Sequence, residues 1–299
     1  MTSTSPPHSE SLNATSCGGL PPKECSQNTD RTSLIGLDRA CFESALVKLG
    51  ERSYRAKQIW HWLYYQGART FDEMTTLPKS LRTRLSSSCN IDRPTVNRMQ
   101  QSEDGALKWL VQFADEREVE CVHIPEEDRG ALCISSQVGC TLTCRFCHTG
   151  TQKLVRNLDA GEIVNQVLIA RDTIGEWPSP KDGRMISNIV MMGMGEPLYN
   201  FDNVRDAMKI AMDGEGIALS RRRITLSTSG VVPEIAKTAE EIGCLLAVSF
   251  HATTDEVRDK LVPINKRWNI ETLLNALREY PKLSNSERIT FEYVMLKDV

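Results

Sequence analysis

The sequence lacks any apolar run long enough to cross a lipid bilayer, and its first residues lack the apolar core of a secretory signal. It also lacks a strong charge of either sign. The formal net charge of −3 gives no general attraction to nucleic acid, so any RNA contact must come from a local patch. We therefore expect a cytoplasmic protein that does not bind membranes.

Cysteine, in contrast, is plentiful: the 299 residues include ten. In a small secreted chain that number would suggest disulfides, but without an export signal it favours metal-binding or redox-active thiols. The composition, 40% hydrophobic and 25% charged, is typical of a globular protein. The length is sufficient for one large domain and a smaller one.

Changes in composition and periodicity divide the chain into four segments. Residues 1–35 are rich in Ser, Thr, Pro and Asn, which predicts a disordered tail. Apolar residues then recur at helical spacing, which predicts a helical domain over residues 36–93. In residues 94–130 apolar and polar residues alternate as they do along a β-strand, which predicts a β extension. The main domain is expected over residues 131–299.

The predicted helical domain has a local surplus of positive charge. Between Glu51 and Arg98 there are nine basic and four acidic residues, interleaved with Trp60, Trp62 and Tyr64. This pattern suits an RNA-contacting module. It fits equally a solvated basic face over an aromatic core, so both interpretations stay open.

A carboxylate stands out in the β extension. Strand alternation over residues 117–125 places Glu120 on the same face as Val122 and Ile124. A carboxylate on an apolar face is costly unless it is paired, functional or on an exposed edge strand.

The chain is organised around a loop that carries Cys140, Cys144 and Cys147 in the spacing C-x3-C-x2-C. Thiolates this close in sequence can converge on a soft metal centre. A structural zinc site with His148 as fourth donor, or three ordinary buried thiols, would also fit. An iron–sulfur cluster held by only three cysteines keeps one iron open to a small molecule, and this is the interpretation we favour.

After this loop, strands and helices alternate. Strands are expected over residues 186–192, 223–227, 245–250 and 289–295. Helices are expected after a capping box formed by Asp159 and Glu162, over residues 202–212 and 269–280, and from Pro233 onward. Such βα units predict a parallel sheet, barrel-like or doubly wound, with ligands at the carboxyl ends of the strands. Polar loops follow these strands. Each loop alone is weak evidence for a binding site. Together with the cysteine loop they predict one site.

Several stretches resemble the RlmN-type radical S-adenosylmethionine (SAM) methyltransferases, from about Arg52 to the end. The matching stretches are Tyr54-Arg55-Ala56-Lys57-Gln58-Ile59, Leu132-Cys133-Ile134-Ser135-Ser136-Gln137-Val138-Gly139-Cys140, Gly193-Met194-Gly195-Glu196-Pro197-Leu198, Leu226-Ser227-Thr228-Ser229-Gly230-Val231-Val232-Pro233 and Ser249-Phe250-His251-Ala252. The resemblance implies an α/β fold. It would be a partial radical SAM (β/α)6-type barrel with its last strand missing, preceded by the helical domain and the β extension.

The resemblance also implies a role for each matching residue. Cys140, Cys144 and Cys147 would bind a 4Fe-4S cluster. Gly195 and Glu196 would hold the amino-acid end of SAM. The rest of SAM would be contacted by Ser227, Ser249, Phe250 and His251. Cys133 would form the transient disulfide that releases the methylated product, and Glu120 would accept a proton.

The family methylates carbon 2 of an adenosine in 23S rRNA and, in some members, of tRNA, through a methyl-cysteine intermediate. The resemblance implies a monomer that takes electrons from a donor such as flavodoxin. No residue excludes a Cfr-type enzyme acting on carbon 8 of the same adenosine. A non-catalytic iron–sulfur protein associated with RNA also stays open.

One departure from the family pattern concerns the carboxyl-terminal part. The family continues through a further strand to the methyl-carrying cysteine, whereas no cysteine follows Cys244 here. We therefore expect residues 1–299 alone to be only partly folded or poorly soluble, and to transfer no methyl group to RNA.

Overall fold

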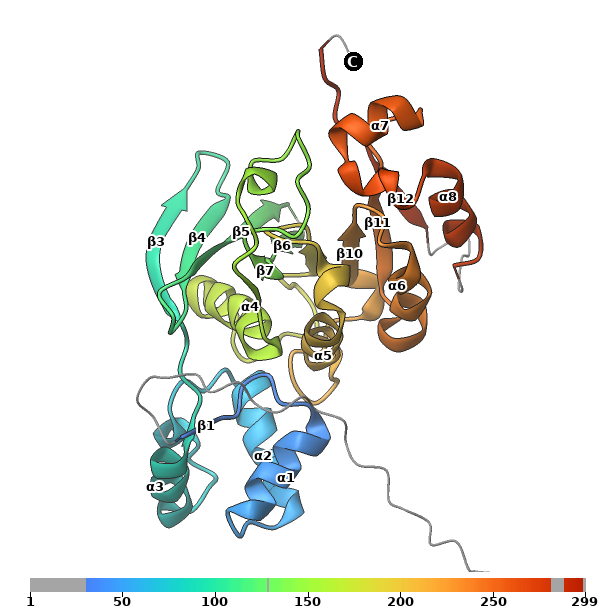
Figure 1. Ribbon diagram of the computed structural model, residues 1–299. Coiled ribbons are helices and arrows are strands. Elements are labelled where there is room, and N and C mark those ends of the chain that lie inside the picture. The colour runs from blue at the N-terminus through green and yellow to red at the C-terminus, as the bar shows by residue number, and fades with distance from the viewer. Residues whose placement is uncertain (1–30, 128, 281–287, 298–299) are drawn as a thin grey trace, which may run out of the picture.

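The computed structural model describes residues 31–127, 129–280 and 288–297. Figure 1 shows two parts: a small group of helices near the amino terminus and a larger sheet with helices packed on it. Residues 1–30 of the predicted tail, which include Cys17 and Cys25, lie outside the described residues. No helix in the described ranges is long and apolar enough to span a membrane.

The amino-terminal module consists of short helices closed by a two-stranded sheet. Its elements are β1 (Thr32–Ser33), α1 (Arg39–Lys48), α2 (Ser53–Tyr64), η1 (Phe71–Glu73), α3 (Lys79–Ser88) and β2 (Cys89–Asn90). Helix α1 begins where Asp38 accepts a hydrogen bond from the Cys41 backbone N–H, as an N-cap does. The extension of the predicted tail to residue 35 is wrong, because β1 pairs with β2 and Leu34 is fully buried beside it.

The aromatic residues of α2 divide between core and surface. Trp60 and Tyr64 are buried, while Trp62 and Tyr65 are only partly covered. The basic residues Arg52 and Lys57 are exposed on the same helix. Two of the aromatics that suggested a base-stacking surface therefore belong to the core, and the exposed charges remain available for an RNA contact.

The larger part is one eight-stranded sheet in the order β12-β11-β10-β9-β6-β5-β4-β3. The three amino-terminal strands, β3 (Thr95–Gln101), β4 (Leu107–Gln112) and β5 (Glu118–Glu126), are antiparallel. The others, β6 (Arg129–Cys133), β9 (Asn188–Met191), β10 (Ile224–Thr228), β11 (Leu245–Ser249) and β12 (Ile289–Glu292), run parallel to one another. The predicted β extension and parallel βα series are thus present in one continuous sheet.

The helices between the parallel strands are α4 (Ala160–Ile174), α5 (Phe201–Met212), α6 (Val232–Lys237), α7 (Asp255–Leu261) and α8 (Ile270–Arg278). Short connecting elements are β7 (Gln137–Val138), β8 (Arg156–Asn157) and the helical turns η2 (Thr149–Thr151), η3 (Pro197–Asn200), η4 (Arg221–Arg223), η5 (Thr238–Ile242) and η6 (Pro263–Lys266). Helix α4 begins with the expected capping box, in which Asp159 and Glu162 bond each other's backbone N–H. Helix α7 was not predicted.

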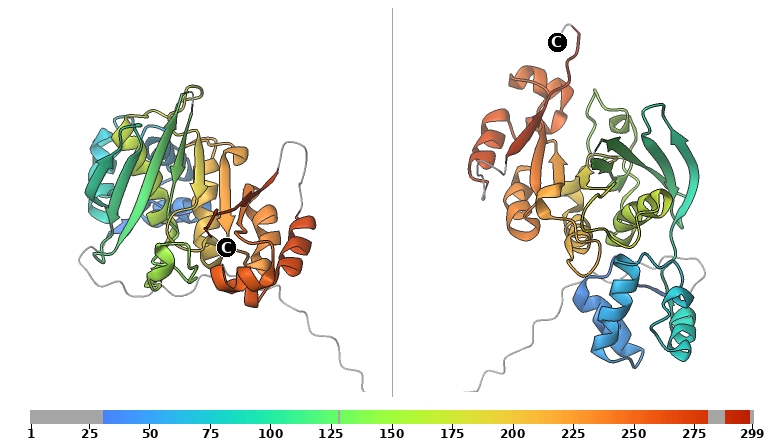
Figure 2. Two further views of the ribbon diagram at one scale, coloured as in Figure 1. Left: turned by 90° about the horizontal axis from the view of Figure 1, so that it is seen from above. Right: turned by 180° about the vertical axis from the view of Figure 1, so that it is seen from behind.

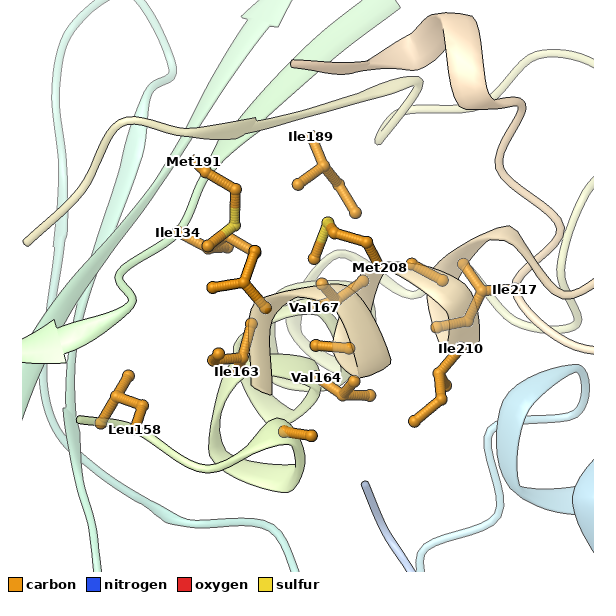
Figure 3. Packing of buried hydrophobic residues seen from close by; sticks show 14 of the residues in the cluster. Ile134, Leu158, Ile163, Val164, Val167, Ile189, Met191, Met208, Ile210 and Ile217 are labelled. Carbon is orange, nitrogen blue, oxygen red and sulfur yellow. The ribbon is translucent and has the colours of Figure 1, made fainter. Parts of the chain in front are cut away.

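One face of the sheet forms the core with these helices. Figure 3 shows Ile189 and Met191 of β9 facing Val167 of α4 and Met208 of α5. All four side chains are buried. Burying each such side chain stabilises the fold by roughly 1.5–3 kcal/mol. The other face of the sheet is therefore left for the residues that alternate with these.

Two carboxylates fix the helical module to the sheet domain. Asp213, just after α5, accepts hydrogen bonds from Arg39 Nε at 2.8 Å and Trp60 Nε1 at 3.2 Å. Asp172 of α4 accepts from Arg93 Nε at 3.0 Å and Trp177 Nε1 at 2.7 Å. In both front and back views the module lies at the end of the molecule opposite the cysteine loop (Figures 1 and 2).

Candidate cluster and cofactor site

Strand register brings the candidate residues of the sheet onto the face away from the helix core. Cys133 pairs with Val122 on one side and Val190 on the other, and Val190 pairs with Thr225. Paired residues of neighbouring strands point to the same face, as do residues two apart on one strand. Glu120, Cys133, Ser227 and Ser249 therefore share one face, together with Glu292, which pairs with Ser249.

A cavity of about 400 Å³ lies where this face meets the cysteine loop. It is lined by all three thiols of the C-x3-C-x2-C sequence, by the Gly195-Glu196 turn and by residues at the ends of β10, β11 and β12. Among the residues from these sources are Cys140, Cys144, Cys147, Gly195, Glu196, Ser227, Ser229, Ser249, His251 and Glu292. The prediction that separate loops form one site at the strand ends agrees with this geometry.

The cysteine loop is shaped by backbone contacts. Gly139 has φ +77°, and a Cβ there would lie 2.2 Å from the Lys153 carbonyl oxygen, so the chain can turn only with glycine. The Arg145 N–H donates to the Leu261 carbonyl at the end of α7 with a 2.9 Å bond. Burial raises the pKa of the Cys140 thiol and raises that of Cys144 to about 11, so both thiols are protonated until a metal displaces the proton.

The donor set fits an iron–sulfur cluster better than a single ion. Within the described ranges, no group of three or more His, Cys, Asp or Glu side chains is arranged to hold one metal ion. His148 is exposed and does not line the cavity, which removes the fourth ligand of the zinc interpretation. In a cubane each thiolate binds a different iron, so three thiols spread around one cavity are the appropriate arrangement.

Glu196 is a buried carboxylate on the cavity wall, 3% exposed. It accepts hydrogen bonds from the backbone N–H groups of Ser229 at 2.8 Å and Leu198 at 3.2 Å. Burial nevertheless outweighs these bonds and raises its pKa to about 7. The preceding Gly195 has φ +101°, and a Cβ there would lie 2.6 Å from Cβ of Gln137. This turn can approach a ligand closely and offer it a carboxylate.

Glu292 of β12 is a site residue that the sequence analysis missed. Its Oε2 accepts hydrogen bonds from Ser249 Oγ at 2.8 Å and Ser227 Oγ at 3.2 Å. These three side chains form one polar wall of the cavity. The serines lie 43 and 65 residues away from Glu292 in the chain, so only the alternation along β12 could have indicated it.

His251 and Phe250 occupy different places despite being neighbours. His251 has φ +57°, and its Nδ1 accepts from the Val294 N–H at 3.1 Å, which leaves a proton on Nε2. That Nε2 is buried without a protein partner in the described structure. Phe250 does not line the cavity. Its ring packs edge-on against the ring of Phe291, with 5.5 Å between the ring centroids.

Glu120 and Cys133 lie farther along the same face and do not line the cavity. Glu120 is 47% exposed at its side chain and pairs with Lys108, which explains how a carboxylate is tolerated on β5. Cys133 is a half-buried free thiol whose pKa is raised to about 11, mainly by burial and further by Glu292 and Glu120. The structure thus brings the two near each other and separates them from the three clustered thiols.

Comparison with known proteins places this fold. One matching family model, described as the ribosomal RNA large subunit methyltransferase N-terminal domain, covers residues 32–91. A second, described as the radical SAM superfamily, covers residues 134–299. A crystal structure of a radical SAM methyltransferase from Sphaerobacter thermophilus is 42% identical, with a TM-score of 0.82 over 90% of this chain and 77% of that one. The fold is that of a radical SAM enzyme.

Curated relatives narrow the family. The dual-specificity RNA methyltransferase RlmN of Paracoccus denitrificans is 68% identical over 89% of this chain and 70% of its own length. The protein of the same name from Dinoroseobacter shibae is 67% identical over 90% of this chain and 71% of its own. The chain belongs to the RlmN family, and the resemblance seen in its sequence is confirmed.

Proposed function

We propose that the protein to which residues 1–299 belong methylates carbon 2 of an adenosine in 23S rRNA and of an adenosine in tRNA, acting in the cytoplasm as a monomer. The observation that carries the proposal is that three thiols, a buried carboxylate and the serine–glutamate wall line the same cavity. RNA as substrate is supported by the names of the relatives, dual-specificity RNA methyltransferases. Electrons would come from a one-electron carrier such as flavodoxin.

Cys140, Cys144 and Cys147 would hold a 4Fe-4S cluster, and the iron without a cysteine would bind SAM. When bound, the cluster and SAM supply one-electron reduction and an organic radical, which the protein's own side chains cannot provide.

The remaining lining residues would bind the parts of SAM. Glu196 would accept hydrogen bonds from its amino group, and the desolvated carboxylate makes that charge-assisted contact strong. Ser227, Ser249 and Glu292 would bind hydroxyl groups, since the carboxylate is an acceptor and each serine can both donate and accept. His251 Nε2–H would donate to an acceptor of the ligand. Phe250 would act only through its backbone.

Cys133 and Glu120 would act in the release of the methylated product. With its pKa raised to about 11, the Cys133 thiol is protonated at neutral pH and needs a proton acceptor before it can attack as a thiolate. Glu120 shares its face of the sheet and would accept a proton. The chain spans about 70% of the length of the curated relatives it matches. Within it, Cys244 does not fit the role of the family's methyl-carrying cysteine, because it is buried at the amino end of β11 and does not line the cavity.

The test is made on the modified RNA itself. Ribosomal RNA and tRNA from cells lacking the gene should contain no 2-methyladenosine at the positions modified in the parent strain, and the gene restored should return it. Mass spectrometry of digested nucleosides measures both. Loss of 8-methyladenosine instead would assign Cfr-type chemistry, and unchanged nucleosides in the deletion strain would refute the enzymatic proposal.

A further inference from the structure

A buried positive charge lies behind the cavity, on α7. Arg258 is 0% exposed, and its guanidinium donates to the carbonyls of Ser229 at 2.8 Å, Phe250 at 3.0 Å and Ser249 at 3.2 Å. It also donates to the side-chain oxygen of Asn265 at 2.9 Å. Among the described residues, no carboxylate forms an ion pair with it. Burying a charge without an opposite charge costs several kcal/mol, so the arrangement calls for a reason.

The side chain of Asn265 separates Asp255 and Asp259 from the guanidinium of Arg258. Asn265 Nδ2 donates to Asp259 Oδ1 at 2.7 Å and to Asp255 Oδ1 at 2.8 Å. A neutral amide therefore stands between the guanidinium and both carboxylates. An aspartate at position 265 would pair with the guanidinium directly, whereas Asn265 keeps Asp255 and Asp259 out of direct contact with it, so the two carboxylates act on it only through space.

Ser229 connects the guanidinium of Arg258 to the cysteine loop. The Ser229 carbonyl accepts from Arg258, while its hydroxyl lies 3.9 Å from Sγ of Cys144. Burial lowers the pKa of Arg258 to about 10, so the guanidinium stays charged at neutral pH. The same side chain also ties the ends of β10 and β11 together, which places the cavity walls relative to Cys144.

We propose that Arg258 is the counter-charge of the cluster site, that it favours the reduced cluster, and that Asn265 keeps this charge from being neutralised. The inference rests on the proposed function, in which Cys140, Cys144 and Cys147 hold a 4Fe-4S cluster. When a one-electron carrier or a chemical reductant gives up one electron, the cluster gains one negative charge and the donor is oxidised. A fixed positive charge nearby stabilises that product and raises the midpoint potential.

The experiment is a potentiometric titration of the cluster-loaded protein, followed by electron paramagnetic resonance. Arg258→Gln should lower the midpoint potential, by at least the amount that changes the reduced-to-oxidised ratio tenfold at fixed potential, about 59 mV for one electron. Arg258→Lys keeps the charge and should stay near the wild type. Asp259→Asn keeps an acceptor for Asn265, removes a negative charge and should raise the potential. Asp255 is less suitable, because it also accepts from the Ile270 N–H at 3.0 Å.

Opposite shifts in Arg258→Gln and Asp259→Asn distinguish a charge effect from damage to packing, which would move both variants the same way. Iron content and Tm are measured on each variant. If Arg258→Gln does not fold or load, the upward shift in Asp259→Asn still decides. No iron uptake by the wild type would overturn the proposed function. A loaded wild type whose Asp259→Asn variant shows no upward shift would overturn this inference alone.

Discussion

Glu196 should make the apo-protein less stable as the pH rises. Its pKa is raised from 4.5 to about 7 in the folded state because the carboxylate is buried. Between these values the folded state binds a proton that the unfolded chain has already released. The stability that Glu196 contributes is therefore fully present below about pH 4.5 and is lost as the pH rises through 7. The difference of about 2.5 units, at roughly 1.4 kcal/mol per unit, amounts to about 3 kcal/mol.

Glu196→Gln removes this titration. The glutamine amide will face the N–H of Ser229 or Leu198, which costs roughly 1–3 kcal/mol at every pH. The informative quantity is therefore the difference in unfolding free energy between wild type and variant, which should change by about 2.5 kcal/mol between about pH 5 and pH 8. Urea denaturation of the reduced apo-protein under anaerobic conditions measures it.

Glu103→Gln, at an exposed position before β4, is the matched control and should leave the pH profile of the wild type unaltered. Parallel profiles for wild type and Glu196→Gln would refute the reasoning, because they would mean that Glu196 is solvated in the folded protein. A carboxylate that costs this much stability is expected only where its charge is used, and SAM binding should be weakened in the same variant.

Two further predictions concern the turn beside Glu196 and the helical module. Gly195→Ala would place a Cβ 2.6 Å from Cβ of Gln137 at φ +101°, so we expect a loss of roughly 1–3 kcal/mol in thermal unfolding, whereas Gly214→Ala, with open space around it, should be nearly neutral. Reversing the charges of Arg52 and Lys57 should weaken RNA binding in filter assays and flatten its dependence on log[salt] by roughly 0.7–0.9 for each phosphate that these side chains neutralise in the wild type. An unchanged slope would show that this helix does not contact the phosphate backbone.

The sequence predicted the features that depend on local spacing. The cysteine loop, the capping box at Asp159 and the βα order are each encoded within a few residues, and the structure contains all three. Polar loops after parallel strands meet at one edge for topological reasons, so a site there could also be expected.

Features that depend on partners distant in the chain could not be predicted. Glu292 is only an acidic residue on a strand until β12 pairs with β11 and brings it to Ser249. Arg258 would ordinarily be assigned to a solvated helix face, since its acceptors are backbone carbonyls that the sequence does not mark.

The position of the helical module limits what the protein can recognise. It is fastened to the sheet domain through Asp213 and Asp172, at the end opposite the cysteine loop (Figure 1). Because the helical module and the cavity are held in fixed positions, the distance between them is fixed as well. An RNA that contacts the module and the cavity together must be folded so that its target base lies at that span from the contacted backbone. A short strand with the same bases can reach only one end at a time, so selection would be by shape as well as by sequence.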